Sequence, residues 1–148
     1  MALTQAMPTS FKVELQTGLH NFTAGTGDVF KIALFRATAS IAGTFGAATT
    51  NYSDMGADEA SGTNYTAGGV ALTNITPTSS GTTAFTDFVD AVFSNVTLTA
   101  SGALIYNSTD GDRAVAVLDF GSDKTATAAD FTIIFPAAAA ATAIIRLV

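Results

Sequence analysis

The chain has 148 residues, of which 48% are hydrophobic and only 12% are charged, and it contains one histidine and no cysteine. Catalytic and metal sites are usually built from the residue types that are scarce here, and the lack of cysteine excludes disulfides and thiolate chemistry. The net charge of −6, with lysine and arginine scattered singly, argues against nucleic-acid binding, because affinity for phosphates requires clustered basic side chains.

The length suits a single domain, residues 1–148. Residues 1–10 contain neither a basic region nor an apolar run, so we expect no conventional secretion signal and an N-terminal arm. Phe11, Val13 and Leu15 alternate with polar residues, which predicts a strand with one face in the core. His20 follows, in what we expect to be an exposed turn.

A second alternating segment, residues 30–34, predicts another strand. The next segment, residues 38–83, is rich in Ala, Thr, Gly and Ser and has only isolated large side chains, so it predicts a long loop. Such loops are uncommon inside a compact domain unless they are functional or disordered. We therefore expect this loop-rich segment to order against a partner.

Residues 85–93 are compatible with a short helix that has Asp87 and Asp90 on its polar side, but the pattern alone does not favour that structure. Strands are predicted further along at residues 96–100, 103–106, 114–120, 131–135 and 144–148. Two of these, 114–120 and 131–135, are apolar on nearly every side, which indicates central or doubly covered strands. The fold class is therefore all-β: a single-domain β-sandwich or jelly roll of roughly seven to nine strands with little helix.

Few residues carry the signature of a chemical site. His20 has no orienting partner or nucleophile beside it, and Gly25-Thr26-Gly27 lacks the third glycine of a phosphate loop. Two acidic groups could offer oxygen ligands to calcium, but neither matches the twelve-residue calcium loop, and Asp-Gly is typical of a tight turn. These groups are Asp54, Asp58 and Glu59, and in the turn Asp110 and Asp112. We predict no catalytic residue, no metal ligand and no cofactor.

All of the asparagines lie in Asn-X-Ser/Thr sequons, which is the acceptor pattern for glycosylation. Because Ser and Thr are so frequent in this chain, several sequons arise by chance. The expected absence of a signal sequence and the lack of cysteine also argue against a glycoprotein. The residues are Asn21, Asn51, Asn64, Asn74, Asn95 and Asn107.

The C-terminal half carries a resemblance to a known family. The segments SGALIYN (101–107), RAVAVLDFGSDKT (113–125), FTIIFP (131–136) and AIIRL (143–147), with NYTAGGVAL (64–72) before them, resemble small virion structural proteins of tailed bacteriophages. The likeness covers most of the chain after about residue 28. Such proteins are similar to head decoration or cement proteins, and the family supplies no catalytic residues.

The resemblance implies a non-enzymatic capsid decoration or cement protein on the outer surface of the virion, made in the cytoplasm of the bacterial host. Its expected partners are the major capsid protein and copies of itself, as a dimer or trimer, with no nucleic acid and no membrane. The alternative is a tail- or fibre-associated protein that contacts other tail proteins or the host surface. We assign the partner interface to Leu3, Met7, Phe45, Tyr52, Met55 and Tyr65.

Overall fold

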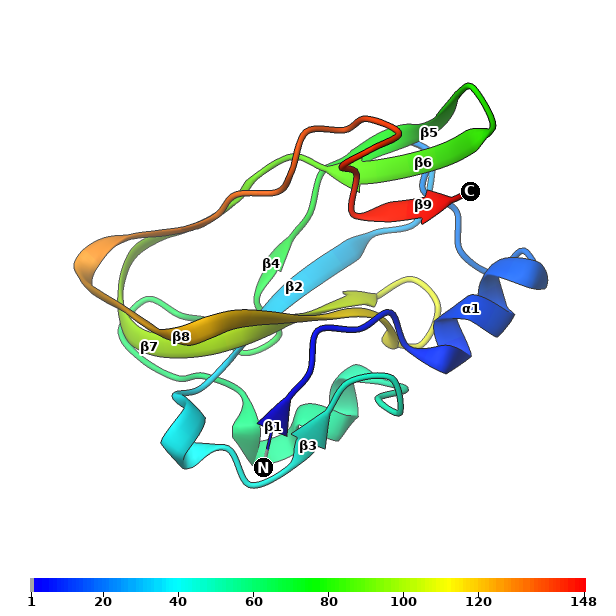
Figure 1. The fold of residues 1–148 in the computed structure, drawn as a ribbon. Helices are drawn as coiled ribbons and strands as arrows, with labels where there is room; N and C mark the ends of the chain where they lie inside the picture. The colour runs from blue at the N-terminus through cyan, green and yellow to red at the C-terminus, as the bar shows by residue number, and fades with distance from the viewer. Residues whose placement is uncertain (1) are drawn as a thin grey trace.

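The computed structural model of the protein describes residues 2–148, and most of its regular structure is β-strand (Figure 1). The elements in chain order are β1 (Ala2–Leu3), α1 (Thr9–Gln16), β2 (Phe30–Phe35), the 3₁₀ turn η1 (Thr38–Ser40), β3 (Thr44–Phe45), the 3₁₀ segment η2 (Tyr52–Asp58), β4 (Val70–Ala71), β5 (Asn74–Ser80), β6 (Thr83–Phe88), β7 (Ala91–Asn107), β8 (Arg113–Ile133) and β9 (Ile145–Leu147).

Two antiparallel sheets form the body of the molecule. One has the strand order β4-β2-β7-β8 and the other has the order β5-β6-β9. In Figure 1 the second sheet lies over one face of the first, and the larger apolar cluster joins them through residues such as Phe30 of β2 and Phe88 of β6. The prediction of an all-β, sandwich-like fold is confirmed, while jelly-roll connectivity stays a prediction.

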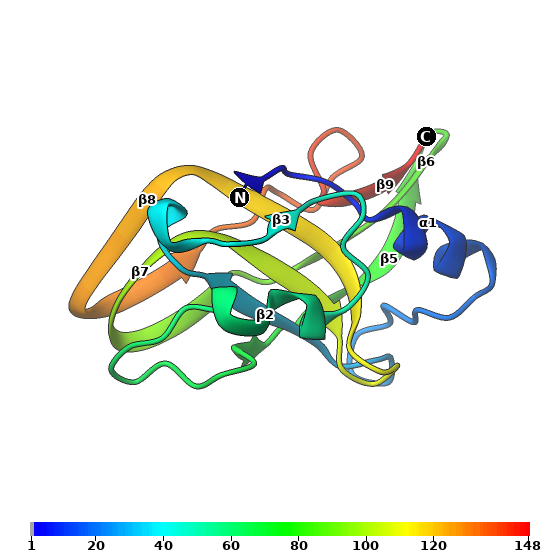
Figure 2. The same cartoon turned by 90° about the horizontal axis from the view of Figure 1, so that it is seen from below.

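The opposite face of the four-stranded sheet is also covered. Figure 2 shows β3 and the η2 segment lying across that face, and a second apolar cluster fills the contact, with Phe35 and Leu104 from the sheet and Phe45 and Met55 from the covering segments. Because β2 is covered on both sides, Phe30 and residues 32–35 are all buried. This double cover explains why the strand needs an almost continuous apolar sequence.

The N-terminal strand prediction is wrong, because Thr9–Gln16 form the helix α1. Pro8 precedes the helix with a φ of −53°, which suits a helix start but not a central strand. Phe11 and Glu14 are buried and Leu15 is partly buried, whereas Val13 is 58% exposed. The covered side chains of Glu14 and Leu15 thus lie three and four residues after that of Phe11, which is the period of a helix face and not of a strand.

The helical alternative for residues 85–93 is also wrong, because they lie in β6, a short connection and β7. Asp87 is not on a polar face: it is fully buried and accepts a hydrogen bond from its neighbour Phe88 N at 2.8 Å. Asp90 accepts from Phe135 N at 2.9 Å, across the molecule. Both aspartates therefore hold backbone groups of the fold.

The long segment 38–83 is ordered against its own sheet, through a carboxylate at its centre. Glu59 accepts hydrogen bonds from Tyr52 Oη at 2.6 Å, Tyr65 Oη at 2.8 Å and Gly68 N at 2.7 Å. Tyr65 Oη in turn accepts from Leu34 N of β2 at 2.9 Å. Burial and the neighbouring Glu59 raise the pKa of both tyrosines, so their hydroxyls stay protonated donors.

Residues 2–10 do not form a free arm, whereas Met1 lies outside the described residues. Ala2 and Leu3 pair in parallel with β3, and Ala6 forms a two-way bridge with Val117 at the outer edge of β8. Thr9 already belongs to the helix α1. The expectation of an N-terminal arm available to a partner is therefore corrected for the described residues.

Candidate interaction surface

The structure buries two of the six predicted interface residues in the core and leaves the other four partly exposed. Phe45 and Met55 are 5% and 2% exposed and belong to the apolar cluster under the four-stranded sheet, so their assignment to an interface is wrong. The remaining four are only partly buried but contact the core: Leu3 and Tyr52 contact the cluster of Phe45, and Met7 and Tyr65 contact the larger one. The segment contained large side chains because it covers a sheet face.

A different surface is built by the long hairpin of β7 and β8. Strand β2 pairs only with residues 102–107 of β7, so residues 91–101 and their partners on β8 continue as a two-stranded ribbon. Register shifts near residues 93–98 interrupt the ladder, and Asn95 and Ala128 adopt positive φ values of 51° and 47° beside them. Bulges of this kind bend a ribbon strongly. The bend returns the end of β8 toward its own middle (Figure 1).

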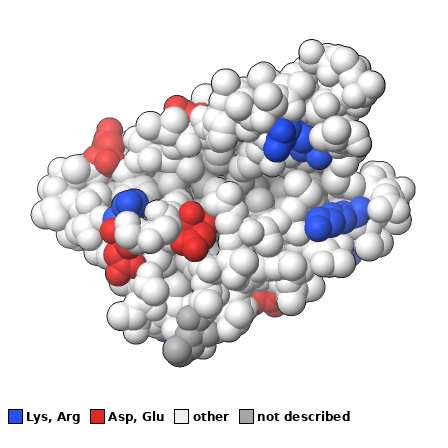
Figure 3. All heavy atoms as spheres, viewed as in Figure 1, with Lys and Arg blue, Asp and Glu red and all other residues white. Residues whose placement is uncertain are grey.

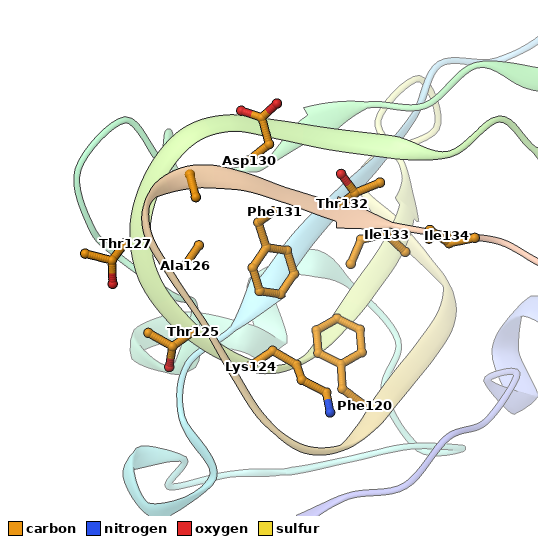
Figure 4. Close-up of a pocket in the computed structure, with 11 residues that line it drawn as sticks. Phe120, Lys124, Thr125, Ala126, Thr127, Asp130, Phe131, Thr132, Ile133 and Ile134 are labelled. Atoms are coloured by element: carbon orange, nitrogen blue, oxygen red, sulfur yellow. The ribbon is translucent and has the colours of Figure 1, made fainter.

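The bend encloses an apolar groove. Phe120 and Phe131, both on β8, face one another with ring centroids 6.0 Å apart, and Figure 4 shows both rings pointing into the hollow. The groove has a volume of about 540 Å³ and adjoins a second hollow of about 410 Å³, with Phe120, Ile133 and Ile134 lining both. Ile134 is 77% exposed. This connected hollow is called the β8 groove below.

The rim of the β8 groove is polar but carries few charges. Figure 4 places Thr125, Thr127 and Asp130 around the rim, with the Lys124 side chain beside Phe120. Lys124 Nζ donates to Ser122 Oγ at 2.8 Å. The face seen in Figure 3 is likewise mostly uncharged, with its Lys, Arg, Asp and Glu side chains in small separate groups. An apolar floor with a polar rim is the general layout of a protein-binding surface.

Two aspartates hold the far wall of the β8 groove, which is formed by the segment after β8. Asp90 accepts from Phe135 N at 2.9 Å at the start of this segment. Asp87 accepts from Ile144 N at 3.2 Å at its end. Burial, supplemented by the charge of Asp90, raises the pKa of Asp87 above the ordinary value of 3.8, although the N–H groups of Phe88 and Ile144 oppose this.

We expect the variant Asp87→Asn to gain stability over the native protein as the pH rises. Because the folded pKa of Asp87 lies above its unfolded value, ionisation destabilises the fold above the folded pKa, and this penalty disappears as the pH falls through it. The melting temperature of the variant minus that of the native protein should therefore increase from about pH 4 to pH 7. Thermal melts of both proteins across this range measure the difference.

The matched control is Asp58→Asn, for which the slope should have the opposite sign and lie below about pH 4, so the melts of this variant extend down to about pH 2. Burial alone would raise the pKa of Asp58, but hydrogen bonds from Ala42 N, Gly43 N and Arg36 outweigh burial and lower it. Its ionised form therefore stabilises the fold at neutral pH, and that stability is lost as the pH falls through the folded pKa. If the melting temperature of Asp87→Asn minus that of the native protein falls as the pH rises, the raised pKa assigned to Asp87 is wrong.

Three of the acidic residues considered as calcium ligands have structural roles. Asp58 holds Arg36 and the turn at residues 42–43, Glu59 holds two tyrosines, and Asp54 caps the η2 segment by accepting from Asn51 N at 3.1 Å. Within residues 2–148, no group of three or more His, Asp or Glu side chains is placed to hold a metal ion. No helix among these residues is long and apolar enough to cross a membrane.

His20 is not in an exposed turn, so that prediction is wrong. Its side chain is fully buried, and Nε2 lies 2.7 Å from Glu14 Oε2. The ring contacts Phe11, with centroids 4.9 Å apart. An orienting carboxylate is thus present, although no sequence pattern indicated one, because the helical register of Glu14 was mistaken for that of a strand.

Three of the sequon asparagines have a local structural role. Asn21, Asn51 and Asn107 each accept, through Oδ1, a hydrogen bond from the backbone N–H two residues later. This is the Asx turn, which asparagine forms readily. Asn107 is also fully buried, so it is not accessible to a glycan. The Asn-X-Ser/Thr pattern at these positions reflects turn formation.

Comparison with known proteins found no match to a protein-family model, a curated protein or a solved structure.

Sequence reasoning missed the β8 groove because its residues were assigned to a covered strand. Phe131, Ile133 and Phe135 are buried, but Ile134 between them is exposed, so the segment is covered on one side only. The available signal was Ile134 itself, an apolar residue at the outward position of an alternating strand.

Proposed function

We propose that the chain is a non-enzymatic structural protein of a bacteriophage virion, and that it acts as a decoration or cement protein on the outside of the head. It would bind the major capsid protein and neighbouring copies of itself by surface contacts alone. The resemblance of the C-terminal segments to small phage structural proteins is one basis for this proposal. The other is the character of the surface, which has few charges and includes an apolar groove.

The observation that carries the proposal is the β8 groove. Its lining includes Phe120, Phe131 and the 77% exposed Ile134, and its volume of about 540 Å³ is sufficient for several apolar side chains of a partner. The groove is held on a sheet, and the N–H groups of Phe135 and Ile144 donate hydrogen bonds to Asp90 and Asp87, so the groove is formed before a partner binds. A pre-formed site lowers the ordering cost of docking. Many copies engaged together would then need only modest affinity each.

We predict that Ile134→Asp weakens docking on virions at least about tenfold while the melting temperature of the isolated protein stays nearly unchanged. Burying an isoleucine side chain contributes about 1.5–3 kcal/mol, and 1.4 kcal/mol corresponds to tenfold in affinity. Because Ile134 is exposed in the isolated chain, its replacement removes little from the core. The measurement is occupancy on particles that lack the native protein, together with a thermal melt.

The matched control is the variant Val13→Asp, because Val13 is an exposed apolar residue on α1, away from the β8 groove. This variant should dock normally. Electron microscopy of gold-labelled protein on the particles gives the location: label over the head supports decoration, and label confined to the tail supports the alternative tail or fibre component. Equal docking by both variants would mean that the β8 groove is not the contact surface. No binding of the native protein to any part of the particle would refute the proposed function.

A further inference from the structure

A buried chain of hydrogen bonds joins α1 to the turn between β7 and β8. On α1, Glu14 Oε2 lies 2.7 Å from His20 Nε2. The other carboxylate oxygen, Glu14 Oε1, accepts a hydrogen bond from Arg113 at 3.0 Å. His20 Nδ1 lies 2.9 Å from Asn107 Nδ2, which also lies 2.8 Å from Asp28 Oδ2. The side chain of His20 and the whole of Asn107 are fully buried.

The direction of every hydrogen bond in this chain is fixed by the backbone. Asn107 Oδ1 accepts from Thr109 N at 3.0 Å and from Asp110 N at 3.2 Å, and both are obligatory donors. The amide nitrogen of Asn107 must therefore face His20 and Asp28, and it donates one hydrogen to each. His20 Nδ1 is then an acceptor without a proton, so the proton of the neutral ring is on Nε2 and is donated to Glu14.

A second proton on the imidazole does not fit this arrangement. It would be placed on Nδ1, where it would face the N–H of Asn107, and two donors cannot share a hydrogen bond. Asp28 Oδ2 is bonded to the same Asn107 nitrogen as His20 Nδ1, so a small movement brings it within reach of the protonated ring. In that second arrangement the imidazolium donates to Glu14 and to Asp28, and Asn107 is released.

We propose that His20 is a proton-operated latch with these two arrangements. At neutral pH the neutral ring holds Asn107, and Asn107 holds the turn through Thr109 and Asp110. In acid the charged ring donates hydrogen bonds to two carboxylates, and Asn107 loses its contacts with His20 and Asp28. The turn at residues 108–112, which Asn107 holds, then becomes less stable. This device is independent of the proposed function and of the β8 groove.

The charges around the ring determine the balance between the two arrangements. Glu14 from α1 and Asp28 from the loop before β2 favour the charged ring, whereas Arg113 at the start of β8 disfavours it. The residues of the β5-β6-β9 sheet that share a pocket with His20 are uncharged: Pro77, Ala84, Phe85, Thr86, Ile145 and Leu147.

The latch has a route to the rest of the molecule. The turn that Asn107 holds contacts the start of the η2 segment, because Asn51 Nδ2 donates to Gly111 O at 2.7 Å and Tyr52 N donates to Asp112 O at 2.8 Å. Loosening the turn would therefore also free the segment that covers the lower face of the four-stranded sheet. The coupled elements are contiguous, as a physical switch requires.

Nuclear magnetic resonance of the ¹⁵N-labelled full chain tests the latch, and the assignment is direct because the chain has one histidine. At pH 8 the ring should carry its proton on Nε2, with Nδ1 as an acceptor. As the pH falls to 5, the ring should gain its second proton, and the exchange protection of Thr109 and Asp110 should fall about tenfold with the same midpoint. These two results together support the proposal.

The control variant is His20→Gln, which keeps a donor for Glu14 but cannot gain a proton. Its Thr109 and Asp110 amides should keep constant protection between pH 8 and 5. If the variant fails to fold, the native protein still decides, because the ring tautomer and the shared midpoint are measured on it alone. A proton on Nδ1 at pH 8, or a ring that becomes charged while both amides stay equally protected, would overturn the latch.

Discussion

Replacing Glu59 by alanine should lower the free energy of unfolding by about 3–5 kcal/mol, because several donors lose their acceptor at once and each unsatisfied buried group costs about 1–3 kcal/mol. The donors are Tyr52 Oη, Tyr65 Oη and Gly68 N, each within 2.8 Å of the Glu59 carboxylate. Through these three contacts Glu59 fixes the segment 52–68 beside β2. Urea unfolding followed by tyrosine fluorescence measures the loss.

Glu59→Gln is the matched control for this change. It keeps one oxygen as an acceptor, and a tyrosine hydroxyl can turn to accept from the new amide, so the expected loss is about 1–2 kcal/mol. The outcome also bears on the interface predicted from the sequence, since Tyr52 and Tyr65 belong to it. If Glu59→Ala is as stable as the native protein, contacts other than those of Glu59 hold the segment 52–68. The hydroxyls of Tyr52 and Tyr65 would then be free to contact a partner.

Gly69→Ala should destabilise the protein by more than about 4 kcal/mol, an exceptional value for one methyl group. Gly69 lies just before β4 with a φ of +72°, and a Cβ built on it would approach the carbonyl oxygen of Ile32 in β2 to 1.8 Å. Backbone atoms of a central strand cannot move aside cheaply. The strand pair β2-β4 should separate, which thermal melts and amide exchange at Ile32 would detect.

Gly81→Ala separates the two causes, because Gly81 also has a positive φ, +58°, but no atom lies within 4 Å of its added Cβ. It should cost only the conformational strain of about 1–2 kcal/mol. Similar losses in the two variants would show that the close approach of Gly69 to β2 is not a constraint on the fold.

Much of the strand content could be predicted from the sequence, because the buried strands are also the most apolar segments. Residues 32–35, 103–106 and 114–117 are buried on both faces, so every position had to be apolar or small. The helix α1 was missed for a physical reason: over a few residues, apolar side chains at positions 11, 13 and 15 fit either period. The burial of Glu14 and the exposure of Val13 distinguish the two, and the burial of Glu14 depends on His20 and Arg113 from elsewhere.

The candidate site could not be predicted, because it depends on how one strand bends. Phe120 and Phe131 come together through register shifts and positive φ values at Asn95 and Ala128, and neither residue type specifies a bend in the sequence. The same holds for the interface assignment. Met55 was expected to meet a partner because it follows no strand pattern, yet it fills the core beneath β2 and β7.

The order of the strands has a consequence for synthesis on the ribosome. Strand β2 pairs along its whole length with residues 102–107 of β7, and both of its faces are buried only in the finished fold. Its apolar sequence FKIALF therefore emerges about 70 residues before its main partner, a delay of roughly 4–14 s at translation rates of 5–20 residues per second. During that time the nascent chain exposes a strand that is prone to aggregate, so slow translation between residues 36 and 101 would be harmful, and chaperones that hold short apolar segments would raise the yield.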